Sequence, residues 1–258
     1  STYRKPKTMI MKFHRILVCA AALLAAVSCS VKISGDGSTE HGFVSFGVDN
    51  EGDIDLITKA SLSDYTTLPA ASDFAIVVKN SDNAAVYEGT VKDWDSSKPL
   101  QVGNYNVTAT YGEEGAEGFG KPYFTGSTGF AVTGGQTTSV SVPAKLGNSL
   151  VKIECSESFR NYFTDYSFTL KTGSGTEIAF PKDETRAAFI EAYKFTLSGS
   201  FTSQGGAEKT FTKDYNSIET NTCYTMKFDA SNIGGLKVTV TFNDTVETVD
   251  CGDLELNE

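Results

Sequence analysis

The chain has 258 residues, with 22 Lys and Arg against 32 Asp and Glu, which gives a formal net charge of −10 at pH 7. Residues 1–28 hold five basic residues and no acidic one, so without them the charge is −15. A surface this acidic repels nucleic acid and anionic lipid headgroups, and we exclude both as partners. His41 is the one histidine after residue 28, and the five cysteines show no CxxC spacing. The sequence therefore excludes a zinc site, and histidine-based catalysis unless His41 itself acts.

The first predicted element is a signal peptide over residues 1–28. A basic start that includes Lys12 and Arg15 precedes an uninterrupted apolar run of 12 residues, 16–27. This run is too short to cross a bilayer, which takes about 20 apolar residues. The layout is typical of a secretory signal. Because it ends at Cys29, it resembles a bacterial lipoprotein signal, and we predict that Cys29 carries lipid and holds the protein at the outer membrane. An ordinary cleaved signal is the alternative.

A tether over residues 29–40 leads into a first strand-rich region, 41–146. Apolar and polar residues alternate there, and Gly, Asn, Asp and Ser separate the alternating runs. Successive strand side chains point to opposite faces, so each run predicts a strand with one buried face. The Gly134-Gly135 pair predicts a hairpin between the last two strands. The predicted strands span residues 43–48, 55–60, 74–79, 84–91, 105–111, 123–132 and 137–142.

The second region, 147–258, repeats the alternation. One short helix is predicted over 157–163, with Ser156 as its N-cap, and a final strand over 246–256. Short strands at close spacing indicate an all-β fold made of two tandem β-sandwich domains, 41–146 and 147–258. The residues expected in the two cores are Phe74, Ile76, Tyr105, Val107, Val140, Phe168, Leu197, Phe228, Val238 and Val240.

The cysteines after the signal give a mixed picture. Cys155 alternates with core positions and is predicted to be a buried thiol. Cys223 shares a strand face with Thr225 and Lys227, so we expect it to point outward. In an oxidising compartment Cys223 could pair with Cys251. Both a disulfide and two free thiols remain open at this point.

The chemistry-bearing residues are few. There is no P-loop and no GxGxxG motif, so we expect no cofactor. The acidic run 49–55 lacks the EF-hand spacing, and we interpret it as a turn rather than a calcium site. Aromatic rings beside carboxylates could form a glycan-binding platform, or could close the open end of a sandwich. The platform residues are Trp94 with Asp93 and Asp95, and Phe119 with Tyr123.

Several segments, taken in order, carry a resemblance to a known family. They are 42–46 (GFVSF), 57–60 (ITKA), 100–109 (LQVGNYNVTA), 121–126 (KPYFTG), Phe159, Tyr162-Phe163, Asp165-Tyr166 and 239–247 (TVTFNDTVE). Together with the lipoprotein-like signal, they resemble uncharacterised lipoproteins of gut Bacteroidales that are related to fimbrillin-like surface proteins. The resemblance covers nearly the whole chain after the signal.

The resemblance implies two sandwiches of transthyretin-like or immunoglobulin-like type and a non-catalytic structural or adhesion role. Some relatives assemble fimbriae after cleavage at an arginine frees a groove for a partner's strand. In this chain the matching position is Lys59, which becomes the one possible processing site. An anchor, tip or accessory component therefore fits better than a shaft subunit, with other envelope or fimbrial proteins as partners. The alternative is a glycan-binding accessory lipoprotein, on either face of the outer membrane.

Overall fold

The computed structural model describes residues 40–50, 61–230, 235–242 and 245–253, the last two ranges by their backbone. The predicted signal peptide, Cys29, nearly all of the tether, and Lys59 with its predicted strand lie outside the described residues. So does most of the acidic run 49–55. Predictions on those residues stay predictions.

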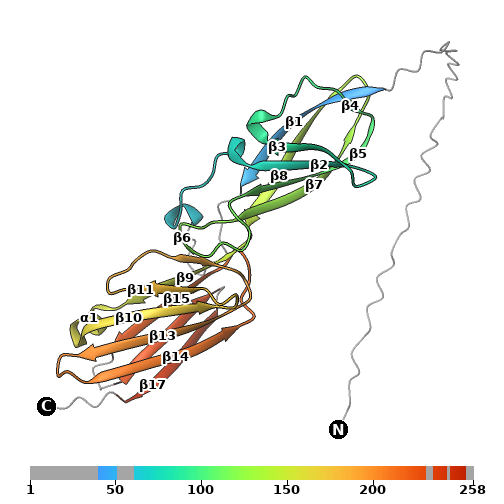
Figure 1. Ribbon diagram of the computed structural model, residues 1–258. Helices are drawn as coiled ribbons and strands as arrows, with labels where there is room; N and C mark the ends of the chain where they lie inside the picture. Colours follow the sequence, from blue (N-terminus) through green and yellow to red (C-terminus); the bar gives the residue numbers. More distant parts are fainter. Residues whose placement is uncertain (1–39, 51–60, 231–234, 243–244, 254–258) are drawn as a thin grey trace, which may run out of the picture. The chain divides into compact units, whose positions relative to one another are not determined.

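Strands in the first part of the chain form one seven-stranded sheet, in the order β3-β2-β5-β7-β8-β1-β4 (Figure 1). Three short 3-10 helices, η1 (Leu62–Asp64), η2 (Ala71–Asp73) and η3 (Val91–Asp93), connect its strands. The strands are β1 (His41–Asn50), β2 (Ala75–Asn80), β3 (Ala85–Thr90), β4 (Leu100–Gln101), β5 (Gly103–Tyr111), β7 (Phe124–Val132) and β8 (Thr137–Leu146).

Strand β8 joins two layers of this sheet. Its residues 137–144 pair in parallel with β1, and Lys145 and Leu146 pair with β7 in the antiparallel sense. Val142 on β8 and Val107 on β5 are fully buried in the same core cluster. The sheet therefore folds over itself through β8 and encloses a hydrophobic core, as a sandwich does.

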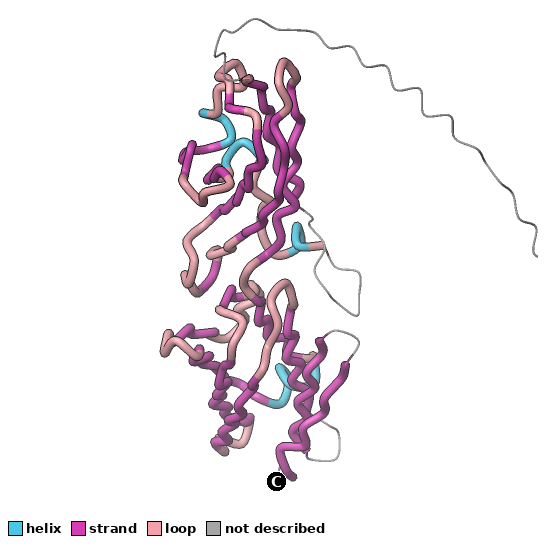
Figure 2. Tube along the Cα trace, turned by 90° about the vertical axis from the view of Figure 1, so that its right-hand side faces the viewer, coloured by secondary structure: helices cyan, strands magenta, loops and turns pink. Residues whose placement is uncertain are grey.

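The later part of the chain forms a four-stranded sheet, β11-β10-β13-β14, and a six-stranded sheet, β17-β16-β15-β9-β12-β6. The two sheets lie face to face, which Figures 1 and 2 show from perpendicular directions. Phe201 of the first sheet and Phe228 of the second are fully buried in one aromatic cluster. The elements are β6 (Gly118–Phe119), β9 (Ser149–Cys155), α1 (Glu157–Tyr162), β10 (Phe163–Thr172), β11 (Glu177–Phe180), β12 (Ala188–Ile190), β13 (Lys194–Ser203), β14 (Glu208–Asn216), β15 (Cys223–Ala230), β16 (Gly235–Phe242) and β17 (Thr245–Asp253).

The two parts of the chain share elements and core residues. Strand β6 precedes β7 in sequence, yet it pairs with β12 of the six-stranded sheet. Leu150, Phe189 and Cys223 come from the later part but are buried in the cluster of the first part. The predicted division into domains 41–146 and 147–258 stays a prediction.

The structure confirms the all-β sandwich prediction. Helix α1 begins after Ser156, whose side chain accepts a hydrogen bond from the Phe159 backbone N–H, as an N-cap does. The predicted C-terminal strand, 246–256, is present as β17 up to Asp253, and residues 254–256 lie outside the described residues. Val238 and Val240 lie where side chains are not described. The other predicted core residues are buried, namely Phe74, Ile76, Tyr105, Val107, Val140, Phe168, Leu197 and Phe228.

A candidate binding cleft at an open sheet edge

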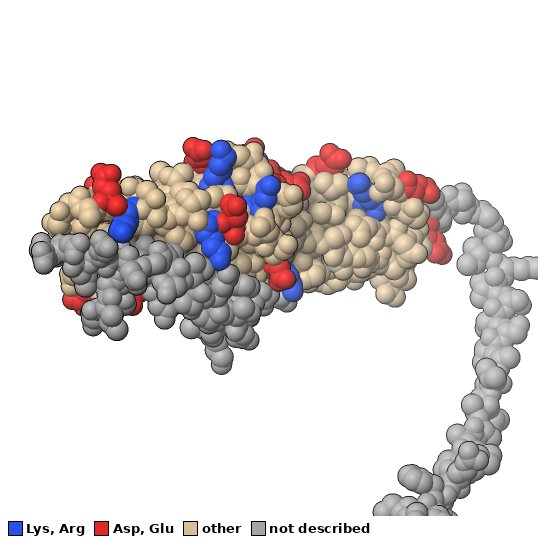
Figure 3. Space-filling model, turned by 90° about the horizontal axis from the view of Figure 1, so that it is seen from below, with Lys and Arg blue, Asp and Glu red and all other residues tan. Residues whose placement is uncertain are grey.

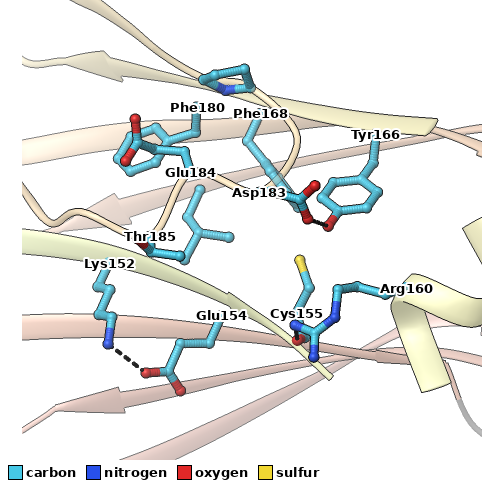
Figure 4. A pocket seen from close by; sticks show the side chains of 12 residues that line it. Lys152, Glu154, Cys155, Arg160, Tyr166, Phe168, Phe180, Asp183, Glu184 and Thr185 are labelled. Carbon is cyan, nitrogen blue, oxygen red and sulfur yellow. Dashed lines mark hydrogen bonds and ion pairs between the residues drawn. The ribbon is translucent and has the colours of Figure 1, made fainter. Parts of the chain in front are cut away.

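A cleft of about 390 Å³ lies beside β9, between the two later sheets (Figure 4). Its floor is the end of β9, residues 152–155, and its far wall is the segment 180–185 that follows β11. Arg160 of α1 and Tyr166 of β10 line one end. The volume falls within the range of about 300–1,000 Å³ that is usual for ligand sites. We refer to this feature as the β9 cleft.

The β9 cleft exists because β12 is short. Strand β15 pairs with β9 along 150–155, whereas β12 pairs on the other side with Ser149, Leu150 and Val151 alone. The backbone N–H of Leu150 donates to Thr222 on the β15 side. Backbone groups alternate between the two edges of a strand, so the N–H and C=O of Ile153 point toward the cleft. This stretch of β9 is an open edge recessed between two sheets.

Polar groups in the β9 cleft are held by their neighbours. The Tyr166 hydroxyl donates to Asp183 Oδ1 at 3.0 Å, and the Arg160 guanidinium donates to the Cys155 carbonyl. Burial, with the Asp183 hydrogen bond, raises the pKa of Tyr166 to about 12. Burial also raises the pKa of the Cys155 thiol to about 12. At neutral pH the thiol and the hydroxyl are therefore both protonated.

Trp94, the centre of the predicted glycan platform, is packed into the first core. Its indole N–H donates to the Val44 carbonyl at 2.8 Å, and its ring meets Phe46 and Tyr87 edge-on at 4.9 and 4.8 Å between centroids. Asp93 and Asp95 are exposed and accept hydrogen bonds from nearby hydroxyls, of Thr90 and Ser97 respectively.

The other predicted platform residues lie elsewhere. Phe119 packs against Phe180 at 5.0 Å, in the aromatic core of the later part, and the Arg186 guanidinium covers its ring at 4.4 Å. Tyr123 lines a separate pocket that also contains Tyr193. The structure therefore does not bring the five residues together, because Trp94 and Phe119 belong to different cores. Glycan binding by any of them stays a prediction.

The expected orientation of Cys223 is wrong. Its side chain is fully buried in the first core cluster, and burial raises the pKa of its thiol to about 11. Alternation placed it on a polar strand face, but Tyr65 from the first part of the chain covers the start of β15 and contacts the thiol. Tertiary packing thus overrides the local pattern.

Of the two alternatives left open for Cys223, the structure has the free thiol, and the bond to Cys251 is not formed in it. Strand registers explain why. Cys223 begins β15, whose opposite end, Ala230, pairs with Leu236 of β16. Cys251 lies in β17 next to Asp250, which pairs with Lys237 at that same end of β16. The two backbones therefore lie at opposite ends of the sheet, well beyond the roughly 7 Å Cα separation that a disulfide tolerates.

Charged patches, metal-binding clusters and membrane-spanning helices would each mark a further site among the described residues. Acidic and basic side chains are interspersed on the face in Figure 3. In the described part of the chain, no group of three or more His, Cys, Asp or Glu side chains is placed to hold a metal ion. None of the helices described combines the length and apolar character of a membrane span.

These features define an all-β protein of the β-sandwich class. The chain belongs to a family described as "Domain of unknown function (DUF4493)", which matches residues 40–252. The resemblance to an uncharacterised family is thereby confirmed. No curated protein matches the sequence.

Several solved structures match this chain over most of its length. A fimbrial assembly protein from Parabacteroides distasonis is 10% identical, with a TM-score of 0.46 over 82% of this chain and 99% of that one. Proteins from Bacteroides thetaiotaomicron, suggested to bind polysaccharide, are 9% identical, with a TM-score of 0.46 over 81% and 98%. A suggested cell-adhesion protein from Bacteroides uniformis is 12% identical, with a TM-score of 0.45 over 82% and 99%.

Proposed function

We propose that this protein is a non-catalytic, lipid-anchored component of the bacterial outer membrane with a structural or adhesion role. In this proposal it engages an extended segment of another envelope or fimbrial protein through the β9 cleft. The observation that carries the proposal is the open edge of β9 at Ile153. An added strand gains affinity from main-chain hydrogen bonds, and pockets for alternate side chains give it specificity.

The contrast with β14 supports the choice of this edge. Strand β14 is also an edge, but it carries Lys209, Lys213 and Asp214 along nine residues. Charged side chains of this kind are how natural sheets discourage unwanted pairing. The β9 edge also carries charged residues, Lys152 and Glu154, but these two pair with each other at 2.9 Å. Unlike β14, this edge lies in a cleft whose walls include Phe168, Phe180 and Pro181. A partner strand there would bury apolar surface as well as form backbone hydrogen bonds.

Photo-crosslinking in whole cells tests the proposal. A photo-reactive amino acid at Lys152, on the rim of the β9 cleft, should form a crosslink to an exported envelope or fimbrial protein identified by mass spectrometry. The matched position is Thr212, exposed on β14, which should not give that product. Crosslinks at equal yield from both positions, or from neither, would contradict strand pairing at β9.

A backbone variant gives a second measurement. Ile153→Pro removes the N–H that points into the cleft, whereas Ile153→Val keeps it. The proline variant should lose the crosslink from position 152, and the valine variant should retain it. Melting curves of both variants report whether the fold survives, because proline is tolerated where a strand edge is open.

The anchor is tested separately. Cys29→Ala should move the protein from the membrane fraction to the soluble fraction, because each buried acyl CH₂ contributes about 0.8 kcal/mol and several chains make attachment nearly permanent. Retention of the variant in membranes would contradict lipid anchoring at Cys29. That outcome would leave the β9 experiment interpretable, since the two measurements use different residues.

A further inference from the structure

A second pocket, of about 250 Å³, lies where loops from both parts of the chain meet. Its walls include Tyr123 and Glu114 from the first part, and Glu191 and Tyr193 from the later part. We call it the tyrosine pocket. Tyr193 is 64% exposed, whereas Tyr166 and Tyr224 are at most 5% exposed. Among the described residues, Tyr193 is the most exposed of the large hydrophobic side chains, and it stands at the rim of a pocket.

Each tyrosine ring of the pocket packs directly against a glycine, Tyr193 against Gly173 and Tyr123 against Gly147. A Cβ atom at Gly173 would lie 2.7 Å from Cδ1 of Tyr193, and a Cβ at Gly147 would lie 2.7 Å from Cδ1 of Tyr123. Any other residue at either glycine would push the ring away. The Lys194 ammonium lies 5.4 Å from the Tyr193 ring centroid and helps to hold that ring. The exposed ring is therefore held in one orientation by its surroundings.

Two further side chains tie the pocket walls together. Glu117 accepts hydrogen bonds from the Glu191 backbone N–H at 2.9 Å and from the Thr172 and Ser174 hydroxyls at 2.6 Å each. It thereby fixes the loop that carries Tyr193 to the loop that carries Glu114.

Asn148, 4% exposed, performs the same task on the opposite wall. Its side chain accepts from the Tyr123 N–H at 3.0 Å and donates to the Lys121 carbonyl at 2.9 Å. The backbone carbonyl of Asn148 accepts a hydrogen bond from the backbone N–H of Asn221 at 3.0 Å, next to Thr220, which lines the pocket. A pocket cross-linked by these hydrogen bonds loses little freedom when a ligand binds, which favours affinity.

The lining selects a chemical class of ligand. Tyrosine rings offer flat apolar faces with a polar edge, and the carboxylates of Glu114 and Glu191 accept hydrogen bonds from hydroxyl groups. All ten lining residues lie in the described part of the chain, and Lys and Arg are absent from them. An anionic ligand would meet these two carboxylates inside the pocket, and a neighbouring cation, Lys194, already lies against the Tyr193 ring outside it. From this geometry we infer that the tyrosine pocket binds a neutral oligosaccharide.

The surface beyond Tyr193 suits a ligand longer than one sugar ring. Gly173, which supports the ring, and Lys194 also line a neighbouring depression of about 420 Å³. That depression also contains Lys171, and its Thr196, Asp214 and Asn216 supply hydroxyl, carboxylate and amide groups. A chain of sugars crossing Tyr193 would find hydrogen-bonding groups on both sides of the ring. This inference does not depend on the β9 cleft, whose lining residues are different.

Binding to a glycan array that contains neutral and acidic oligosaccharides tests the inference, with the purified full-length protein in detergent as the probe. We expect retained glycans to be neutral. Isothermal titration calorimetry with the best of them should show affinity lowered by at least about tenfold for Tyr193→Ala. Glu191→Gln keeps a hydrogen-bonding amide and should lower affinity less, while relaxing the discrimination against acidic glycans.

Matched variants separate the ring from general effects. Tyr193→Phe keeps the stacking face and should stay within about threefold of the parent affinity. Phe43→Ala removes another exposed aromatic ring, 36% exposed on β1, and should not alter binding. Because Tyr193 is largely in solvent, Tyr193→Ala should leave the melting temperature nearly unchanged. An array without neutral hits, hits confined to acidic glycans, or equal affinity of the parent and Tyr193→Ala would each overturn the inference.

Discussion

The core of the first part of the chain and the core of the later part are built from different residues. The first is mainly aliphatic, with Val44, Ile76, Val107 and Val142 fully buried between its layers. The later core is dominated by rings, and Phe201 alone has its centroid within 6.0 Å of those of Phe159, Phe163, Phe168 and Phe228. Both patterns arise from the same two-residue alternation, so alternation fixes burial but not the type of core.

The difference predicts how much free energy of unfolding each part loses when a core side chain is shortened. Aromatic side chains bury more area per residue, and edge-to-face pairs add about 0.5–1.5 kcal/mol beyond that area. An aliphatic core spreads its stabilisation over many smaller groups, each of which is less costly to trim. The later part should therefore be sensitive at single positions, and the first part more tolerant.

The largest expected effect is that of Phe201→Ala. The ring is fully buried and contacts four other rings, so its removal should lower the free energy of unfolding by about 3–5 kcal/mol. Chemical denaturation monitored by circular dichroism measures this change. The comparison substitution is Ile76→Val in the aliphatic core, with an expected loss of about 0.5–1.5 kcal/mol. A similar decrease in the free energy of unfolding in the two variants would contradict the view that the aromatic core is more sensitive to single substitutions than the aliphatic core.

An intermediate effect is expected at Glu117, which links the two parts. Burial raises the pKa of this carboxyl, but hydrogen bonds from Ser174, Thr172, the Glu191 N–H and Thr176 together bring it below its ordinary value of 4.5. Glu117→Gln should lower the free energy of unfolding at pH 7 by about 1–2 kcal/mol, because these donors then lose a charged acceptor. Glu113→Gln, an exposed carboxyl in the same loop, should change little.

The pH dependence follows from the sign of the shift. The pKa of Glu117 is lower in the folded state than in the unfolded state, where it is near 4.5, so ionisation of Glu117 stabilises the fold. This stabilisation is fully present above pH 4.5 and is lost as the pH falls through the pKa of the folded state. The parent and Glu117→Gln should thus differ fully at pH 7 and converge below pH 4.5. Denaturation midpoints measured from pH 7 to pH 3 test this, and a constant difference across that range would show that Glu117 acts without its charge.

Much of the fold could be predicted because alternation and turn residues are local signals. The run Tyr166, Phe168, Leu170 revealed a strand with one buried face, and Ser156 marked the start of the helix. Non-local features escaped prediction. Nothing near Gly118 and Phe119 in the sequence signals pairing with β12, and nothing near Cys223 signals that Tyr65 would cover it.

The same limit applies to the binding sites. The sequence drew attention to Trp94 because it is the one tryptophan between two aspartates, yet its ring is packed against Phe46 and Tyr87. Tyr193 carries no comparable local signal, since its exposure depends on Gly173 and on the loop held by Glu117. Tyr123 was identified for its ring but could not be paired with a partner 70 residues further along the chain. Local patterns indicate residue types, and tertiary contacts decide which of them meet.

The smallest expected effect is that of Trp94→Phe in the first part. Phenylalanine keeps an aromatic ring beside Phe46 and Tyr87 but loses the N–H that donates to the Val44 carbonyl at 2.8 Å. Loss of one such hydrogen bond should lower the free energy of unfolding by about 0.5–1.5 kcal/mol, measured by the same denaturation assay. The variant should bind any neutral glycan identified on the array with parent affinity, because its ring serves packing. A loss of glycan affinity in Trp94→Phe, with Tyr193→Ala unaffected, would instead place the sugar site in the first part of the chain and restore the platform that the sequence suggested.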